Sequence, residues 1–113
     1  MAALRRAALR EMREALAAAV RGRIKDGDDL HAPRTVADGA DRASLPSRTA
    51  AKAAVYQAWK RSGLSKSALG KAMDRDEVEV RRILDPDHGT KLGQMEAAAH
   101  ALGGRLVVSF VPA

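Results

Sequence analysis

Apolar residues recur at helical spacing through the first thirty residues of the chain. Four of them lie three or four positions apart and form one narrow stripe: Leu9, Met12, Leu16 and Val20. Three arginines occupy the rest of the circumference: Arg6, Arg10 and Arg13. This pattern predicts an amphipathic helix within residues 1–30 that ends at the acidic, glycine-containing cluster 26–29. Because such a helix is stabilised mainly by packing, it docks on the rest of the chain or on a second copy, or it is the remnant of a partner-binding domain.

No period of two or 3.6 residues is sustained in residues 31–48, where Pro33, Gly39 and Pro46 interrupt the chain. We interpret this stretch as a linker. Helical periodicity returns in residues 49–113, and four short helices are expected there: 49–62, 66–73, 77–84 and 91–102. The expected N-caps are Thr49, Ser65 and Thr90, together with a capping box formed by Asp76 and Glu79. The apolar line of the last helix is Leu92, Met95, Ala99 and Leu102.

The chain closes with a β-branched and aromatic run that predicts one strand: Leu106, Val107, Val108, Ser109, Phe110 and Val111. A lone strand must find a partner for its backbone groups. Pairing with the same strand of a second copy would give an antiparallel ribbon and a homodimer. The alternatives are a strand at Arg34–Ala37 or the sheet of another protein. The fold class expected is therefore mainly α, a four-helix domain with one C-terminal β-strand, preceded by a long amphipathic helix and a linker.

Charge and composition narrow the class of partner. Twenty Lys and Arg residues against fourteen Asp and Glu give a net charge of +6, which favours nucleic acid first and a membrane surface second. Aromatic residues make up only 3% of the chain, too few for a single-strand stacking platform. The absence of cysteine excludes disulfides and thiolate chemistry, and three isolated histidines (His31, His88 and His100) suggest no metal site. The longest apolar run in the N-terminal part, Ala15–Val20, is too short for a signal or membrane segment. We expect a cytoplasmic protein that is not an enzyme and needs no cofactor.

Two short helices joined by a tight turn on a basic chain suggest a helix-turn-helix that binds double-stranded DNA. The first, 66–73, would lie across the backbone with Ser65 facing a phosphate. The second, 77–84, would enter the major groove. Its outward residues are Glu77, Val78, Arg81 and Arg82. Arg82 suits guanine, Val78 a thymine methyl group, Glu77 a cytosine amine and Arg81 a phosphate. Thr90 and Lys91 are further phosphate candidates. The alternative interpretation of the arginines is a solvated charged face.

Three segments together resemble the C-terminal half of HicB-family antitoxins: 63–69, 80–88 and 101–109. The most distinctive is Val-Arg-Arg-Ile-Leu-Asp-Pro-Asp-His at 80–88. The resemblance covers about 49–111 and extends more weakly to 14–30. It implies a DNA-binding antitoxin that represses its own operon and pairs with a HicA-type ribonuclease toxin. In the resulting hypothesis of a dimeric repressor, Lys66, Arg75 and Lys91 would contact phosphates.

The chain departs from that family at two places. The family holds its toxin with an N-terminal ribonuclease-H-like sheet, whereas residues 1–30 correspond at most to its last helix. Either the protein starts further upstream, or it is a truncated relative that keeps DNA binding. The turn of the family contains Gly-Val, and here it is Asp74-Arg75. Because Asp tolerates a left-handed conformation better than most residues, we expect the turn to survive.

A second hypothesis from a different class is a protein-interaction module. In it, the N-terminal helix would hold a toxin or another protein and the C-terminal bundle would only dimerise. The acidic residues Asp76, Glu77 and Glu79 at the start of the second helix favour this alternative. A folded relic without function is the third interpretation.

Overall fold

The computed structural model describes residues 2–30, 45–110 and 112. Most of the predicted linker, with His31 and the segment Arg34–Ala37, lies outside these residues, and so does Val111. The helices of the described part are α1 (Ala2–Lys25), α3 (Ser47–Ser62), α4 (Lys66–Met73), α5 (Glu77–Leu84) and α6 (Leu92–Ala101). No strand occurs among the described residues. The mainly helical fold class predicted from the sequence is therefore confirmed.

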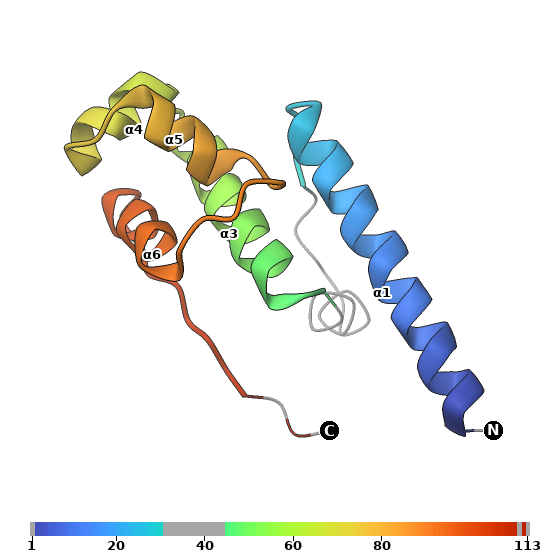
Figure 1. Cartoon of the computed structure of the whole chain (residues 1–113). Coiled ribbons are helices and arrows are strands. Elements are labelled where there is room, and N and C mark those ends of the chain that lie inside the picture. The colour runs from blue at the N-terminus through green and yellow to red at the C-terminus, as the bar shows by residue number, and fades with distance from the viewer. Residues whose placement is uncertain (1, 31–44, 111, 113) are drawn as a thin grey trace.

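Helix α3 is the central element, with α1 on one side and α4, α5 and α6 on the other (Figure 1). The core forms where α3 to α6 meet, and its buried residues are Val55, Leu69, Val80, Ile83, Leu84, Met95 and Ala98. Trp59, Met73 and Leu106 are partly buried against this cluster. The apolar faces that the sequence predicts for 66–73 and 77–84 thus meet each other, and both also pack against α6, while α5 in addition contacts α3. This packing fixes the relative orientation of α4 and α5.

Within the described ranges, only the second half of α1 packs against other elements. Ala17 and Ile24 are buried against α3, and the described residues up to Ala15 are all exposed. The described part of the chain covers only the second half of the predicted apolar stripe: Leu16 and Val20 are partly buried, whereas Leu9 and Met12 are exposed. The reason lies in the geometry: the first half of α1 extends past the beginning of α3 (Figure 1), so no described helix covers it.

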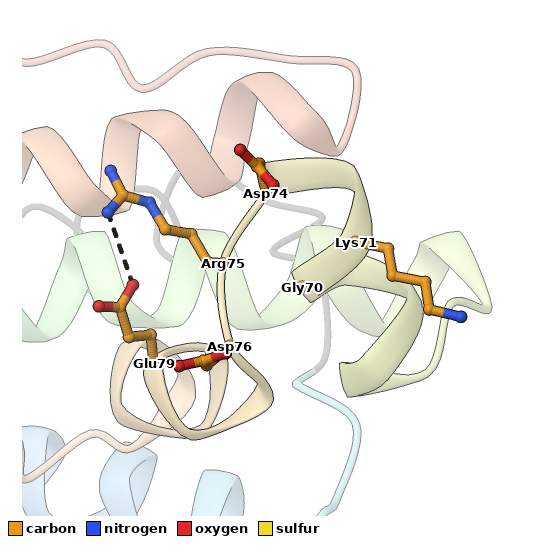
Figure 2. A pocket seen from close by; sticks show the side chains of 6 residues that line it. All are labelled: Gly70, Lys71, Asp74, Arg75, Asp76 and Glu79. Atoms are coloured by element: carbon orange, nitrogen blue, oxygen red, sulfur yellow. Dashed lines mark ion pairs between the residues drawn. The ribbon is translucent and has the colours of Figure 1, made fainter.

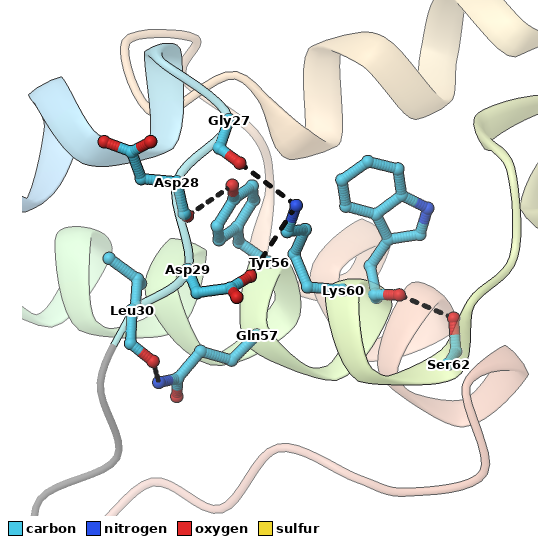
Figure 3. A network of polar contacts seen from close by, with 9 residues as sticks. Gly27, Asp28, Asp29, Leu30, Tyr56, Gln57, Lys60 and Ser62 are labelled. Carbon is cyan, nitrogen blue, oxygen red and sulfur yellow. Dashed lines mark hydrogen bonds and ion pairs between the residues drawn. The ribbon is translucent and has the colours of Figure 1, made fainter.

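The end of α1 is tied to α3 by a polar network (Figure 3). The Tyr56 hydroxyl donates to the carbonyl of Asp28 at 2.7 Å. The side-chain amide of Gln57 donates to the carbonyl of Leu30 at 2.8 Å, and Lys60 Nζ donates to the carbonyl of Gly27 at 3.0 Å. Three side chains from little more than one turn of α3 thus hold the backbone that follows α1, which fixes the end of α1 to the helical bundle. Burial raises the pKa of Tyr56, which keeps its hydroxyl a donor.

Three of the predicted helix caps are not formed. Helix α3 begins two residues before Thr49, after Pro46, whose backbone (φ −54°, ψ 142°) is already extended ahead of the first turn. Thr90 does not cap α6, because its hydroxyl is turned into the core and Lys91 takes the N-cap position. The predicted capping box is also absent: Asp76 is the N-cap of α5 but makes no side-chain cap bond, and Glu79 pairs with Arg75 instead. Leu92, predicted to be on the apolar line of the last helix, is exposed.

Candidate nucleic-acid interface

The turn between α4 and α5 brings the two helices into close contact at Gly70. A Cβ atom on Gly70 would lie 2.8 Å from the carbonyl oxygen of Arg75 and 3.4 Å from a methyl group of Val80. The amide of Arg75 also donates to the carbonyl of Gly70 at 2.8 Å. Gly70 therefore has no room for a side chain, and its missing Cβ lets the turn fold back against α4.

Asp74 makes the reversal by adopting a left-handed conformation, with φ 56° and ψ 48°. It is the single described non-glycine residue with positive φ. Its amide donates to the carbonyls of Gly70 and Lys71, which closes the C-terminus of α4. The expectation that Asp supports the turn in place of Gly is confirmed. The turn and its neighbours line an open hollow between the helices (Figure 2): Gly70, Lys71, Asp74, Arg75, Asp76 and Glu79.

The start of α4 is capped as predicted. The Ser65 hydroxyl oxygen accepts from the amide of Ala68 at 3.0 Å. Lys66 lies over the ring of Trp59, with Nζ 5.8 Å from the ring centroid. A cation at this position is attracted by the face of the indole. Lys66 is the first residue of α4, and its contact with Trp59 holds the side chain beside the end of α3.

The outward face of α5 carries one apolar and several charged side chains. Val78 is 53% exposed, and Arg82, one turn further along, is also exposed. Among the described residues Arg82 has no carboxylate within ion-pair distance, whereas Arg81 pairs with Glu77 at 3.3 Å. Arg75 pairs with Glu79 at 3.8 Å, as the dashed line in Figure 2 shows. Both pairs are exposed, so each is a weak contact that a stronger anionic ligand can displace.

The C-terminus of α5 is held by Lys52, a residue of α3 that is only 1% exposed. Its Nζ donates to the carbonyls of Arg82 and Ile83 at 2.9 and 2.8 Å, and to the Thr90 hydroxyl at 2.5 Å. Burial lowers the pKa of Lys52 to about 8, against the opposing effect of Asp85. The last carbonyls of a helix carry partial negative charge, so an ammonium is a fitting cap. The Thr90 hydroxyl also donates to the Arg82 carbonyl, which leaves Lys91 as the exposed cation of this loop.

The loop between α5 and α6 is joined to α1 through Asp87. Its carboxylate pairs with Lys25 and, at 3.7 Å, with Arg21, and its carbonyl accepts from Arg48 at 3.2 Å. Lys25 lowers the pKa of Asp87 by hydrogen bonding, and Asp87 raises the pKa of Lys25. The amide of Asp87 donates to the Asp85 carboxylate at 2.9 Å, so these acids make a turn. The described residues contain no group of three side chains that could hold a metal ion.

Charge is unevenly distributed between the helices. The segment 65–91, which includes α4 and α5, holds six Lys and Arg residues and six Asp and Glu residues, so its formal net charge is zero. Helix α1 holds seven Lys and Arg residues and two Glu, a net charge of +5. Helix α1 therefore has the largest net positive charge of the helices, ahead of α3 at +4, while the acidic cluster 26–29 contributes −3.

The C-terminal segment leaves α6 and runs along the outside of the bundle (Figure 1). Leu106 is partly buried against the core, and its amide donates to the Glu96 carboxylate at 3.1 Å. Val107, Val108 and Phe110 are exposed, Phe110 to 91%. Ser109 is exposed as well. The C-terminal segment thus carries three exposed large apolar side chains close together in the sequence.

Sequence reasoning missed three residues of this region: Lys52, Gly70 and Lys71. The signal for Gly70 was available, since a glycine inside a predicted short helix often marks a close backbone approach. Lys52 carried no such signal, because nothing in the spacing distinguishes a buried lysine from the exposed Lys60. Lys71 lies on the exposed face of α4, beside the hollow in Figure 2, and was overlooked among the other cations.

Comparison with known proteins relates the chain to HicB antitoxins. It is 34% identical over 65 residues to the antitoxin HicB of Pseudomonas fluorescens (strain Pf0-1), an alignment that covers 58% of this chain and 44% of that antitoxin. The resemblance noted from the sequence is thus confirmed as a relationship over this part of the chain, which spans less than half of the antitoxin's length. No protein-family model matches the chain. None of the helices in the described ranges is both long and apolar enough to cross a membrane.

Proposed function

We propose that this protein is a DNA-binding repressor related to HicB antitoxins, and that α4 and α5 form its helix-turn-helix. The observation that carries the proposal is the contact at Gly70. It holds two eight-residue helices together through a three-residue turn while the outward face of the second helix stays exposed. A rigid pair of this kind presents one helix to the major groove while the other crosses the sugar-phosphate backbone.

The residues of α5 have distinct roles in this proposal. Arg82 makes a bidentate contact to guanine, and Val78 meets a thymine methyl group. Glu77 accepts from a cytosine amine, and Arg81, released from Glu77, contacts a phosphate. The phosphates of the flanking backbone are bound by Ser65, Lys66, Arg75 and Lys91. Thr90 is left out of this set, because its hydroxyl is buried and occupied by Lys52 and Arg82.

We further propose that residues 106–111 pair with the same segment of a second copy. Backbone groups of an extended segment need partners, and exposed valine and phenylalanine side chains favour a sheet. A two-fold homodimer would place two copies of α5 on a palindromic operator. The relationship to an antitoxin extends the proposal to a toxin-antitoxin system, with a HicA-type toxin as a candidate protein partner. In domain terms, residues 1–30 remain the partner-binding element and 49–113 the DNA-binding and dimerisation unit.

The test is binding of the purified chain to duplex DNA from immediately upstream of its own gene, compared with a random duplex, at low and physiological salt. We expect a dimer that prefers the upstream duplex and weakens as salt rises. Equal affinity for both duplexes at both salt concentrations would contradict the proposal.

A protein-interaction module is the second candidate function. It is favoured by the zero net charge of segment 65–91 and by the exposed apolar residues of α1, which include Leu4, Leu9 and Met12. In this alternative α1 binds another protein and the bundle only dimerises. Deleting residues 1–30 separates the two functions. A repressor would lose protein binding and keep its preference for the operator, whereas an interaction module would lose protein binding and have no operator preference to keep.

A further inference from the structure

We propose that the exposed first half of α1 is a second, sequence-independent binding surface for the phosphates of duplex DNA, formed by Arg6, Arg10 and Arg13. This inference rests on the proposed DNA-binding function and names where its electrostatic attraction comes from. We call these three residues the arginine row.

The need for such a surface follows from the charges of α4 and α5. A duplex attracts its protein mainly through cations that displace counterions from phosphates. The segment 65–91 has no net charge, and two of its arginines, Arg75 and Arg81, are paired with glutamates. That segment can read bases, but it offers little general attraction to a polyanion. The attraction must come from another part of the chain, and α1 has the largest net positive charge of the helices. Helix α3 has four cations, but Lys52 is buried and Lys60 pairs with Asp29.

The arginine row has the geometry of a continuous face. Its members lie four and three residues apart, and the same spacing continues to Ala17, which is buried against α3. The face of α1 that packs on α3 in its second half therefore becomes basic in its first half. All three arginines are exposed, and no described carboxylate lies within ion-pair distance of them. At about 1.5 Å per residue, Arg6 and Arg13 lie roughly 10 Å apart along the helix axis, the reach of about three phosphates along one strand.

The row is also held firmly in place. Lys25 and Arg21 join the end of α1 to Asp87, and three side chains of α3 hold the backbone that follows it. Helix α1 therefore projects as an arm of the same body that carries α5 (Figure 1). The arm gives the duplex a contact outside the site that α5 reads. Because the arm is already fixed, this contact costs little conformational entropy when the duplex binds.

The experiment compares the full chain with a row variant, Arg6→Gln/Arg10→Gln/Arg13→Gln. The matched control removes three other exposed arginines, Arg5→Gln/Arg23→Gln/Arg105→Gln, and has the same net charge. Glutamine keeps the helix propensity of arginine, and far-UV circular dichroism checks that each variant folds. Affinities for the upstream and random duplexes are measured across a salt series, and binding to phosphatidylcholine vesicles containing phosphatidylserine is measured in parallel.

We expect the row variant to weaken binding to both duplexes by the same factor and to leave the preference for the upstream duplex intact. Its log–log salt slope should fall by about 2–3 per protomer, whereas the control should change little. Equal losses of DNA affinity in the row variant and the control would overturn the inference, because the effect would then depend on net charge and not on the position of the arginines. An unchanged slope with lost vesicle binding would also overturn it, in favour of a membrane surface. If the natural chain showed no preference for the upstream duplex, the proposed function would be contradicted instead. The affinities of the row variant and the control for the random duplex would still test the role of the arginine row.

Discussion

The ammonium of Lys52 lies 2.8 Å from the carbonyl oxygen of Ile83 and so joins the middle of α3 to the last turn of α5. The last carbonyls of a helix have no partner within that helix, and a buried one left unpaired is costly. Lys52 thus holds the proposed recognition helix from its C-terminal end, while the Gly70 contact and the Asp74 turn position its N-terminal end. Each contact can be tested by substitution.

Replacing Lys52 with methionine should destabilise the fold by about 1–3 kcal/mol, because the Ile83 carbonyl and the Thr90 hydroxyl would lose their buried donor. Urea unfolding followed by circular dichroism measures the change. Lys71→Met is the control, since Lys71 is exposed on α4 and its side chain makes no hydrogen bond or ion pair with the described residues. If both variants unfolded at the same urea concentration, Lys52 would not be the cap described here.

The lowered pKa of Lys52 predicts a specific dependence of stability on pH. The ordinary value is 10.5 and the folded value is about 8, so between these values the unfolded chain binds more protons than the folded one. The free energy of unfolding contributed by this group therefore rises with pH across that window. We expect the stability of the natural chain relative to Lys52→Met to increase from pH 8 to pH 10. A difference that stays flat or falls over this range would show that the ammonium is not penalised by burial.

Replacing Asp74 with glycine should stabilise the protein. A left-handed backbone strains any residue with a Cβ, although the greater freedom of glycine in the unfolded chain offsets part of the gain. We expect a net gain of about 0.5 kcal/mol, seen as a rise of ~2–4 °C in the melting temperature. Asp76→Gly is the matched control, because Asp76 has an ordinary φ of −67° and should gain nothing. A melting temperature lowered by Asp74→Gly would indicate that the aspartate side chain itself supports the turn.

Replacing Gly70 with alanine should destabilise the protein by about 1–3 kcal/mol, because the added methyl group would lie 2.8 Å from the Arg75 carbonyl oxygen. The matched control is Gly22→Ala in α1, where a Cβ has nothing within 4 Å. There the better helix propensity of alanine should stabilise by about 0.5–1 kcal/mol. Thermal unfolding of the two variants therefore shifts in opposite directions. Equal shifts would mean that α4 and α5 are not in the contact described.

Local signals in the sequence predicted the elements of the bundle well. Gly63 and Ser65 bracket the connection between α3 and α4, and Asp74 was expected to adopt the left-handed turn that it forms. These features depend on neighbours in the chain, so the sequence carries them directly.

Contacts between distant residues were not predictable in the same way. Thr90 looks like a cap in the sequence, but Lys52, 38 positions earlier, draws its hydroxyl into the core. Glu79 shows that local contacts can also compete, since it has the spacing of a capping box but pairs with Arg75, four positions earlier. The sequence also does not reveal that Leu9 and Met12 stay exposed, because a helical pattern does not tell how far the neighbouring helix extends. The candidate DNA contacts of α5 stay predictions, since their test is binding.

The most direct measurement is the ratio of affinities for the upstream and random duplexes, determined for the natural chain, Arg82→Gln and Arg81→Gln. We predict that Arg82→Gln lowers this ratio, which corresponds to a loss of about 1–3 kcal/mol in the binding preference for the upstream duplex, because it removes a base contact. Arg81→Gln should weaken both duplexes alike and leave the ratio unchanged, since its role is to bind phosphate. A natural chain without preference, or an Arg82→Gln variant with the full preference, would contradict the assignment of α5 as the recognition helix.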